Sequence, residues 1–119
     1  MAGPNIVSVA TLSAQTAVQQ VSTTTAAIVT NSASSGRVIK VGALYISNVD
    51  GTNNAEIDVA IQRSSTDYHI AKTVVVPADA TLDVISKPVF LEEGDALRLT
   101  ASANSDLEAV CSFEQLSES

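Results

Sequence analysis

Hydrophobic and polar side chains alternate along much of the chain beyond residue 36. The clearest run is AEIDVAIQR, which places Ile57, Val59 and Ile61 on one face and mostly polar side chains on the other. Successive side chains of a β-strand point to opposite faces, so a period of two indicates a strand with one buried face. We therefore predict a strand at residues 55–63 that packs its apolar face against a second layer.

A second run, RVIKVGALYIS, carries apolar residues at both phases of the alternation. One face would hold Ile39, Val41, Ala43 and Tyr45, and the other would hold Val38, Leu44 and Ile46. Apolar residues on both faces are typical of a strand that is covered on both sides. The sequence thus predicts a central strand at residues 37–47.

Strand-like runs and turn-rich segments follow one another along the rest of the chain. The further runs are DYHIAKTVVV, ATLDVIS, ALRLTAS and LEAVCSFEQL, and the segments between runs are NVDGTNN, RSSTD, VPADA, SKP, EEGD and SANSD. Turn signals at such regular spacing are typical of all-β sandwiches and barrels. We predict one domain with an antiparallel β-sandwich of about eight strands, Greek-key or jelly-roll-like.

The first 36 residues contain no charged side chain, and every Lys, Arg, Asp and Glu lies from Arg37 onward. This segment is rich in Ser, Thr, Ala, Gln and Val, whereas a solvated tail normally carries charge. Two interpretations stay open: strands that lie against their own sheet or a neighbouring subunit, or a flexible arm. We accordingly divide the chain into residues 1–36, an uncharged arm with the first strands, and residues 37–119, the sandwich body.

Composition narrows the classes of partner. The chain has 119 residues, a net charge of −7 and only six basic residues, which argues against nucleic-acid binding, because phosphate contacts need clustered Lys and Arg. Its single cysteine, Cys111, allows no intrachain disulfide and fits a reducing compartment. No apolar run reaches membrane-span length, and the N-terminus lacks the pattern of a secretory signal. We expect a soluble protein made in a cytoplasm.

Four residues, Glu92-Glu93-Gly94-Asp95, bring three carboxylates together between two strand-like runs. A pair of carboxylates acting as acid and base needs opposed placement and pKa values that differ. Here the carboxylates are crowded into a predicted turn, in which Gly94 supplies a positive φ. We predict the water-facing bend of a hairpin and no catalytic role.

The segment NVDGTNNAEID offers the best set of oxygen ligands for a metal ion. Its candidate ligands are Asp50, Asn53, Asn54, Glu56 and Asp58. The spacing lacks the alternating ligands and the terminal Glu of an EF-hand, and Asp50-Gly51 is a common turn dipeptide. We predict a loop at one end of the sandwich and no bound metal.

Other residues with chemical potential have structural explanations. The alternation places His69, the only histidine, on the surface, and it places Cys111 in phase with Leu107 and Phe113 as a small core residue. No nucleophile elbow, phosphate loop or zinc spacing is present. We therefore predict no catalytic residue, no cofactor and no enzymatic activity.

The order of turns and strands resembles a family of small β-sandwich virion proteins of tailed bacteriophages. The resemblance covers most of residues 20–116, with a strand that ends in Asn, a VPA turn, and an L-E-x-G-D-x-L pattern leading into ASA. The matching residues are Asn48, Val76-Pro77-Ala78, Leu91, Glu92, Gly94, Asp95, Leu97 and Ala101-Ser102-Ala103. These positions shape turns and strands, so the resemblance carries over no functional residue.

The resemblance implies a non-enzymatic structural protein of the virion, expected on the capsid surface after assembly in the host cytoplasm. Short single-domain members look like capsid decoration, or cement, proteins. The expected partners are then the major capsid protein or other virion proteins, together with further copies of this chain as a dimer or trimer. A neck, collar or tail-appendage protein is one alternative, and a receptor- or carbohydrate-binding module that uses Tyr45 or Tyr68 is another.

We expect the uncharged N-terminal segment to form the interface in such an assembly. An extended segment can add a strand to a neighbour through backbone pairing, which needs no charge complementarity. The residues predicted for this interface are Ile6, Val7, Val9, Leu12, Thr23, Thr24 and Thr25.

Overall fold

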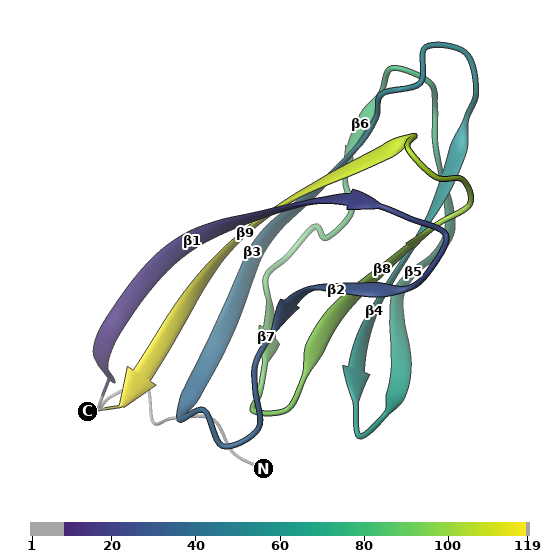
Figure 1. Ribbon diagram of the computed structural model, residues 1–119. Helices are drawn as coiled ribbons and strands as arrows, with labels where there is room; N and C mark the ends of the chain where they lie inside the picture. The colour runs from purple at the N-terminus through teal and green to yellow at the C-terminus, as the bar shows by residue number, and fades with distance from the viewer. Residues whose placement is uncertain (1–8, 119) are drawn as a thin grey trace.

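The computed structural model describes residues 9–118, and every regular element in this part of the chain is a β-strand. The strands form two antiparallel sheets that pack face to face (Figure 1). They are β1 (Val9–Val21), β2 (Ala26–Thr30), β3 (Arg37–Asn48), β4 (Ala55–Arg63), β5 (Thr66–Val76), β6 (Thr81–Asp83), β7 (Val89–Leu91), β8 (Ala96–Ala101) and β9 (Leu107–Glu118). The prediction of an all-β sandwich is confirmed.

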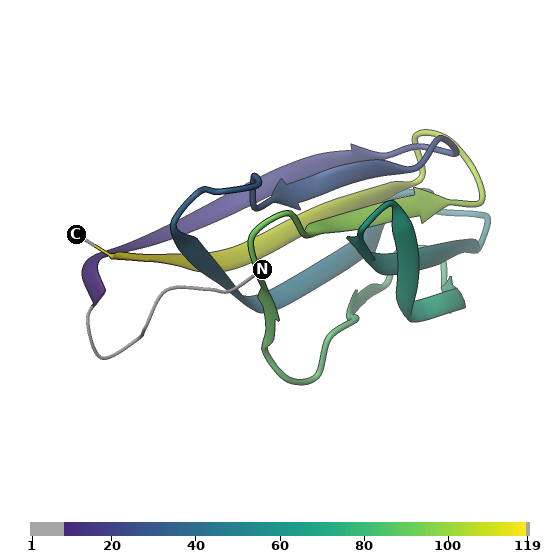
Figure 2. The same cartoon turned by 90° about the horizontal axis from the view of Figure 1, so that it is seen from below.

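The order of strands is that of a jelly roll. One sheet has the order β1-β9-β3-β6, with β7 also paired to β3, and the other has the order β2-β8-β4-β5 (Figure 2). Strands β6 and β7 lie along the same edge of β3, opposite residues 45–47 and 39–41 respectively. Counted as one interrupted strand, they give the eight strands of a rolled-up hairpin, with β1 beside β9 and β2 beside β8.

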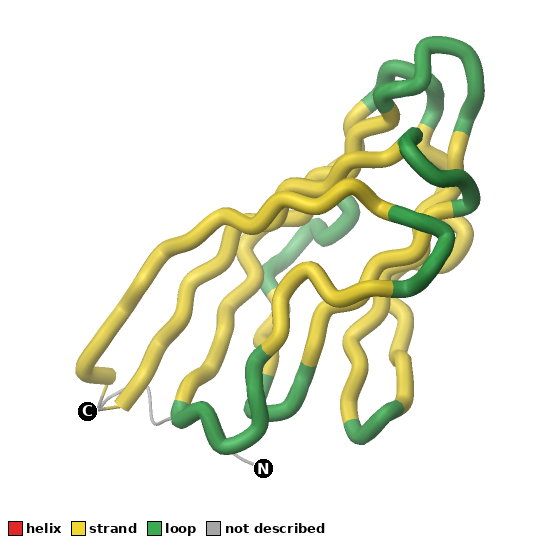
Figure 3. The backbone as a smooth tube through the Cα atoms, viewed as in Figure 1, coloured by secondary structure: helices red, strands yellow, loops and turns green. Residues whose placement is uncertain are grey.

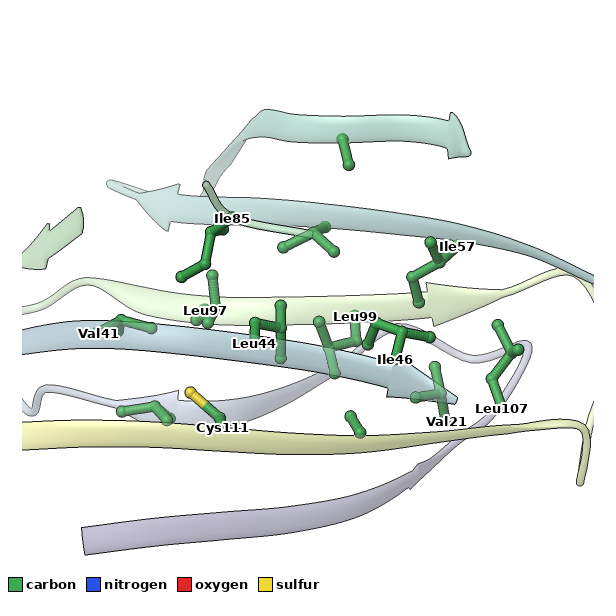
Figure 4. Packing of buried hydrophobic residues seen from close by; sticks show 14 of the residues in the cluster. Val21, Val41, Leu44, Ile46, Ile57, Ile85, Leu97, Leu99, Leu107 and Cys111 are labelled. Atoms are coloured by element: carbon green, nitrogen blue, oxygen red, sulfur yellow. The ribbon is translucent and has the colours of Figure 1, made fainter. Parts of the chain in front are cut away.

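The core lies between the two sheets and consists almost entirely of aliphatic side chains (Figure 4). Leu44 and Ile46 of β3 face Ile57 of β4 and Leu97 and Leu99 of β8 across the interior. These five side chains are at most 1% exposed. The strands that the alternation predicts at residues 55–63 and in ALRLTAS therefore bury the apolar faces expected of them.

Strand β3 departs from the predicted pattern because it contains a bulge. Its register with β9 shifts between Val41 and Ala43, which leaves Gly42 as an extra residue. The shift reverses the phase of the alternation, so that Ile39 and Val41 face the core together with Leu44. The predicted division of faces was therefore wrong. The prediction of cover on both sides fails at Tyr45, which is 44% exposed, whereas Val38, at the phase opposite to Ile39, is 7% exposed.

The loops lie at the ends of the strands (Figure 3). The tightest of them is Ser64-Ser65, which joins β4 and β5 with Arg63 opposite Thr66. Both serines have positive φ, 53° and 64°, as a type I′ turn requires. The segment RSSTD is therefore a two-residue hairpin turn.

Candidate functional site

The acidic turn at residues 92–95 joins β7 of one sheet to β8 of the other. The predicted hairpin was therefore wrong, because these two strands pair with β3 and with β2 and β4 and not with each other. Gly94 has a φ of 90°, which confirms the predicted turn, but the Asp95 side chain is fully buried. Its Oδ1 accepts a hydrogen bond from Nε of Arg63 at 2.8 Å, and its Oδ2 accepts one from Nη2 of Arg63 at 2.5 Å. The expectation that all of these carboxylates face water was wrong for Asp95, because its partner comes from the distant end of β4.

Neighbouring groups complete this junction. The main-chain N–H of Glu92 donates to Oδ2 of Asp95 at 2.9 Å, and Nη2 of Arg63 also lies 3.1 Å from Oε2 of Glu92. The hydrogen bonds from Arg63 hold the pKa of Asp95 below its usual value and raise that of the guanidinium. Glu93 accepts from the N–H of Gly36 at 2.6 Å. The three carboxylates therefore connect this turn to the end of β4 and to the residue before β3.

Two buried asparagines hold further backbone segments together. Asn31 donates its amide to the carbonyls of Arg37 and Leu91, both at 3.0 Å. Asn48 donates in the same way to Asn53 and Val76, both at 2.9 Å. Each amide thus joins backbone segments that are separate in sequence, and each is at most 2% exposed.

Sequence reasoning placed Asn48 and Asp95 at turns, and it predicted burial for none of the three groups. A signal was present, because each polar residue lies in phase with inward-facing apolar residues. Asn48 follows Leu44 and Ile46, and Asp95 precedes Leu97 at the same phase. A polar residue at an inward phase indicates a buried hydrogen-bonding group. The alternation cannot name its partner, because Arg63 lies on another strand.

The candidate metal loop is a turn held by its own side chains. Oδ1 of Asp50 accepts hydrogen bonds from the main-chain N–H groups of Thr52 and Asn53, which lowers its pKa. Asp58 on β4 instead contacts β5, with Lys72 at 3.2 Å. Within residues 9–118, no three His, Cys, Asp or Glu side chains form a group that could hold a metal ion.

The remaining candidate residues lie apart from one another. His69 is exposed on β5, and Cys111 is buried in the core, where desolvation raises the pKa of its thiol to about 11. Tyr45 belongs to the β1-β9-β3 sheet and Tyr68 to β5 of the other sheet, so they form no common stacking platform. Tyr68 lines an open depression of about 330 Å³ with Ile61 and Arg63.

The four sheet edges differ in how well they could accept another strand. Strand β5 has two register shifts against β4 and a positive φ at Thr73, and β2 is five residues long with a shift of its own. Strands β6 and β7 are three residues each. Strand β1 runs for 13 residues, and its only register shift against β9 lies at its start, between Val9 and Thr11. Long regular edges are templates for strand addition, and short or bulged edges are not.

The residues predicted for the interface are distributed unevenly over this edge. Leu12 lies in β1 with 60% of its side chain exposed, and Val9 is the first residue of the strand. Ile6 and Val7 lie outside the described residues. Thr23, Thr24 and Thr25 form the connection between β1 and β2, where Thr25 contacts Thr100 at 2.6 Å and the N–H of Thr23 donates to Asn104. The threonines thus contact their own chain.

The part of the chain that the structure describes has no helix long and apolar enough to cross a membrane. No protein-family model matches the chain. No curated protein matches its sequence either.

The search of solved structures finds an appendage chain and a phage capsid protein among its matches. A chain of the Bacillus endospore appendages, described as a novel family of disulfide-linked pili, is 16% identical with a TM-score of 0.55, and the match covers 92% of this chain and 88% of that one. At this identity the likeness shows a shared fold. Two structures of a pentameric capsid protein from metagenomic phage sequences are 20% identical, with TM-scores of 0.43 and 0.44. Those matches cover 85% of this chain and 60% and 61% of the capsid chains.

Proposed function

We propose that this chain is a non-enzymatic structural subunit of a tailed-phage virion. Within that class it acts as a capsid decoration protein, which binds the major capsid protein and reinforces the head lattice as a homo-oligomer. The observation that carries the proposal is the edge of β1, which is long, regular and free of charged side chains. Such an edge is costly to leave exposed, because it invites pairing with other chains, and its presence favours a protein that assembles.

The other features of the molecule agree with an assembly role. The conspicuous charged groups, Asp95 and Arg63, are bonded to each other and stabilise loops. The appendage chain from Bacillus supports the proposal, since it places the same fold in a protein described as a pilus. A rigid sandwich with one extendable edge is suited to repeated contacts between subunits.

Copy number in the particle tests the proposal. Purified phage particles are analysed by quantitative gel or mass spectrometry, with the major capsid protein as internal standard. Hundreds of copies per particle are expected for a decoration protein. A ring stoichiometry of 6 or 12 copies would instead support the neck or tail-appendage alternative, and absence from the particle would overturn the proposal.

Attachment tests the role of the N-terminal segment in the same particles. A chain that lacks residues 1–15 is expected to lose binding to capsids, because the deletion removes the first half of β1. Far-ultraviolet circular dichroism monitors whether the sandwich stays folded. Undiminished binding by the folded, shortened chain would remove this segment from the mechanism.

A further inference from the structure

Within residues 9–118, the outer edge of β1 is the one sheet edge that is long, regular and uncharged. Among the described residues no strand pairs with that edge, since β1 is terminal in its sheet and its other side is occupied by β9. The edge of β5, by contrast, carries Asp67 and Lys72. The whole chain has a net charge of −7, so two copies repel each other least where both surfaces are neutral. The preferred partner of this edge is therefore a strand that is itself uncharged.

The side chains of β1 are arranged symmetrically about its middle. The strand spans residues 9–21, and Gln15 is its central residue. Leu12 and Val18 lie three positions on either side of Gln15, and they are the most exposed large apolar side chains of the strand, at 60% and 75%. In antiparallel pairing centred on Gln15, Leu12 of one copy lies opposite Val18 of the other, and this contact occurs twice. A strand with this symmetry is self-complementary.

Further exposed apolar side chains lie beside Val18 on the outer face of the sheet. Val18 lies opposite Val110 of β9, and Val110 lies opposite Tyr45 of β3. Val110 and Tyr45 are 38% and 44% exposed. A pair of copies joined along β1 would therefore carry an apolar row across both halves of one continuous sheet.

We infer that β1 pairs antiparallel with β1 of a second copy, around a two-fold axis at Gln15, so that the two β1-β9-β3 sheets become one. This inference deepens the proposed assembly role and rests on it, with the partner now specified as a second copy of this chain. Full overlap of the two strands forms roughly a dozen main-chain hydrogen bonds. It also buries both Leu12-Val18 pairs, and each cross-strand apolar pair stabilises a sheet measurably.

Opposite charges introduced at positions 12 and 18 test the register. Leu12→Lys is expected to raise the dissociation constant of the dimer roughly tenfold, because it replaces both apolar contacts with unpaired charges. Leu12→Lys combined with Val18→Glu should restore the dimer, since each introduced ammonium then faces an introduced carboxylate of the other copy. Within one chain the two positions are roughly 20 Å apart, so the rescue cannot be intramolecular. Analytical ultracentrifugation measures the dissociation constants, and thermal unfolding confirms that each variant folds.

Cross-linking tests the axis independently. Gln15→Cys places the two introduced thiols directly opposite each other, and a short homobifunctional thiol reagent should join them. Thr11→Cys is the matched control, because position 11 faces position 19 of the other copy and lies roughly 27 Å from its own equivalent. The native thiol of Cys111 is fully buried and leaves the background low.

Other ways of covering the β1 edge predict different results in these experiments. The two-fold pairing would be overturned by a trimer or by a wild-type chain that stays monomeric at high concentration. It would also be overturned if Leu12→Lys combined with Val18→Glu failed to restore association. Loss of association on removing residues 1–8, with Leu12→Lys unaffected, would assign the edge to the N-terminal segment of another copy. These measurements use purified protein, so a chain that dimerises yet is absent from virions would overturn only the proposed function.

Discussion

Asp95 combines a charged group with complete burial, and its hydrogen bonds explain how the fold accommodates it. Its two carboxylate oxygens accept from Arg63 at 2.5 and 2.8 Å and from the N–H of Glu92 at 2.9 Å. A buried carboxylate that is fully hydrogen-bonded to a guanidinium is tolerated, whereas the loss of either partner is costly. The pair therefore ties the β7–β8 turn to the β4–β5 hairpin.

Replacement of Asp95 by Asn should destabilise the protein by about 2 kcal/mol, because Arg63 loses its ionic partner and the new amide places a donor against other donors. The free energy of unfolding is measured by urea denaturation at pH 7. Glu93→Gln is the control, since Glu93 makes one exposed hydrogen bond to Gly36. Equal stability of Asp95→Asn and wild type would show that the ion pair contributes nothing.

The same carboxylate makes stability depend on pH. The pKa of Asp95 is lowered in the folded protein, chiefly by the hydrogen bonds from Arg63, so the folded state binds fewer protons than the unfolded state. The contribution of ionised Asp95 to the free energy of unfolding is complete above the ordinary pKa of about 3.8. It is lost as the pH falls through the lower pKa of the folded state. We expect the difference in stability between wild type and Asp95→Asn to shrink below about pH 4. A difference that stays constant down to pH 2 would contradict this assignment.

Asn48 shows that a neutral side chain can also hold loops together through hydrogen bonds. Asn48→Ala leaves the carbonyls of Asn53 and Val76 without their donor and should cost about 2 kcal/mol in the free energy of unfolding. Asn104→Ala is the matched control, because Asn104 is exposed and accepts a single hydrogen bond from Thr23. Chemical denaturation of both variants compares the two costs, and a similar loss in each would argue against a special role for Asn48.

At the scale of elements, irregularities determine which edges of the sandwich can pair. The bulges between β4 and β5 twist one edge, and the break between β6 and β7 divides another, whereas β1 stays regular from Thr11 onward. Alternation in the sequence predicts that a strand exists, but it locates no bulge. Strand β3 is an example, because the extra residue Gly42 reverses the faces to which all later side chains of the strand point.

The β4–β5 hairpin offers a direct test of backbone strain within an element. Ser64 and Ser65 both adopt positive φ, which costs free energy for L-residues other than Asn and Asp, whereas glycine adopts it freely. The double substitution Ser64→Asn and Ser65→Gly supplies the preferred residues of a type I′ turn and should stabilise the protein by roughly 1 kcal/mol. Ser86→Gly is the control, because Ser86 is exposed between β6 and β7 and has no positive φ, so the change should be neutral or slightly destabilising. Thermal unfolding measures both, and a lower melting temperature for the double variant would contradict the turn assignment.

At the scale of the molecule, the jelly roll closes one aliphatic core around the side chain of Cys111. This thiol is fully buried between the sheets, and desolvation raises its pKa to about 11. The ends of the described chain lie on neighbouring strands, with Val9 opposite Glu118 (Figure 1). Opening of the core around Cys111 therefore requires separation of strands from both ends of the chain.

Cys111 should consequently report unfolding of the whole domain. At pH 8 the native protein is expected to react with iodoacetamide far more slowly than the urea-unfolded protein, because the reagent needs an exposed thiolate. The native rate should rise with urea in parallel with the global unfolding equilibrium. Mass spectrometry measures the labelling. A fast native rate that is insensitive to urea would indicate local opening near β9.

The sequence by itself determined most of the strands beyond residue 36, the positions of the turns between them and the buried face of β4, because alternation and turn chemistry act between residues that are close along the chain. It also marked the first 36 residues as uncharged. Only the tertiary structure decided that Asp95 meets Arg63, that β1 pairs with β9, and that β1 lies at a sheet edge. Those outcomes depend on which distant strands become neighbours, and the free energy that selects them comes from packing two sheets over one core, which no local pattern encodes.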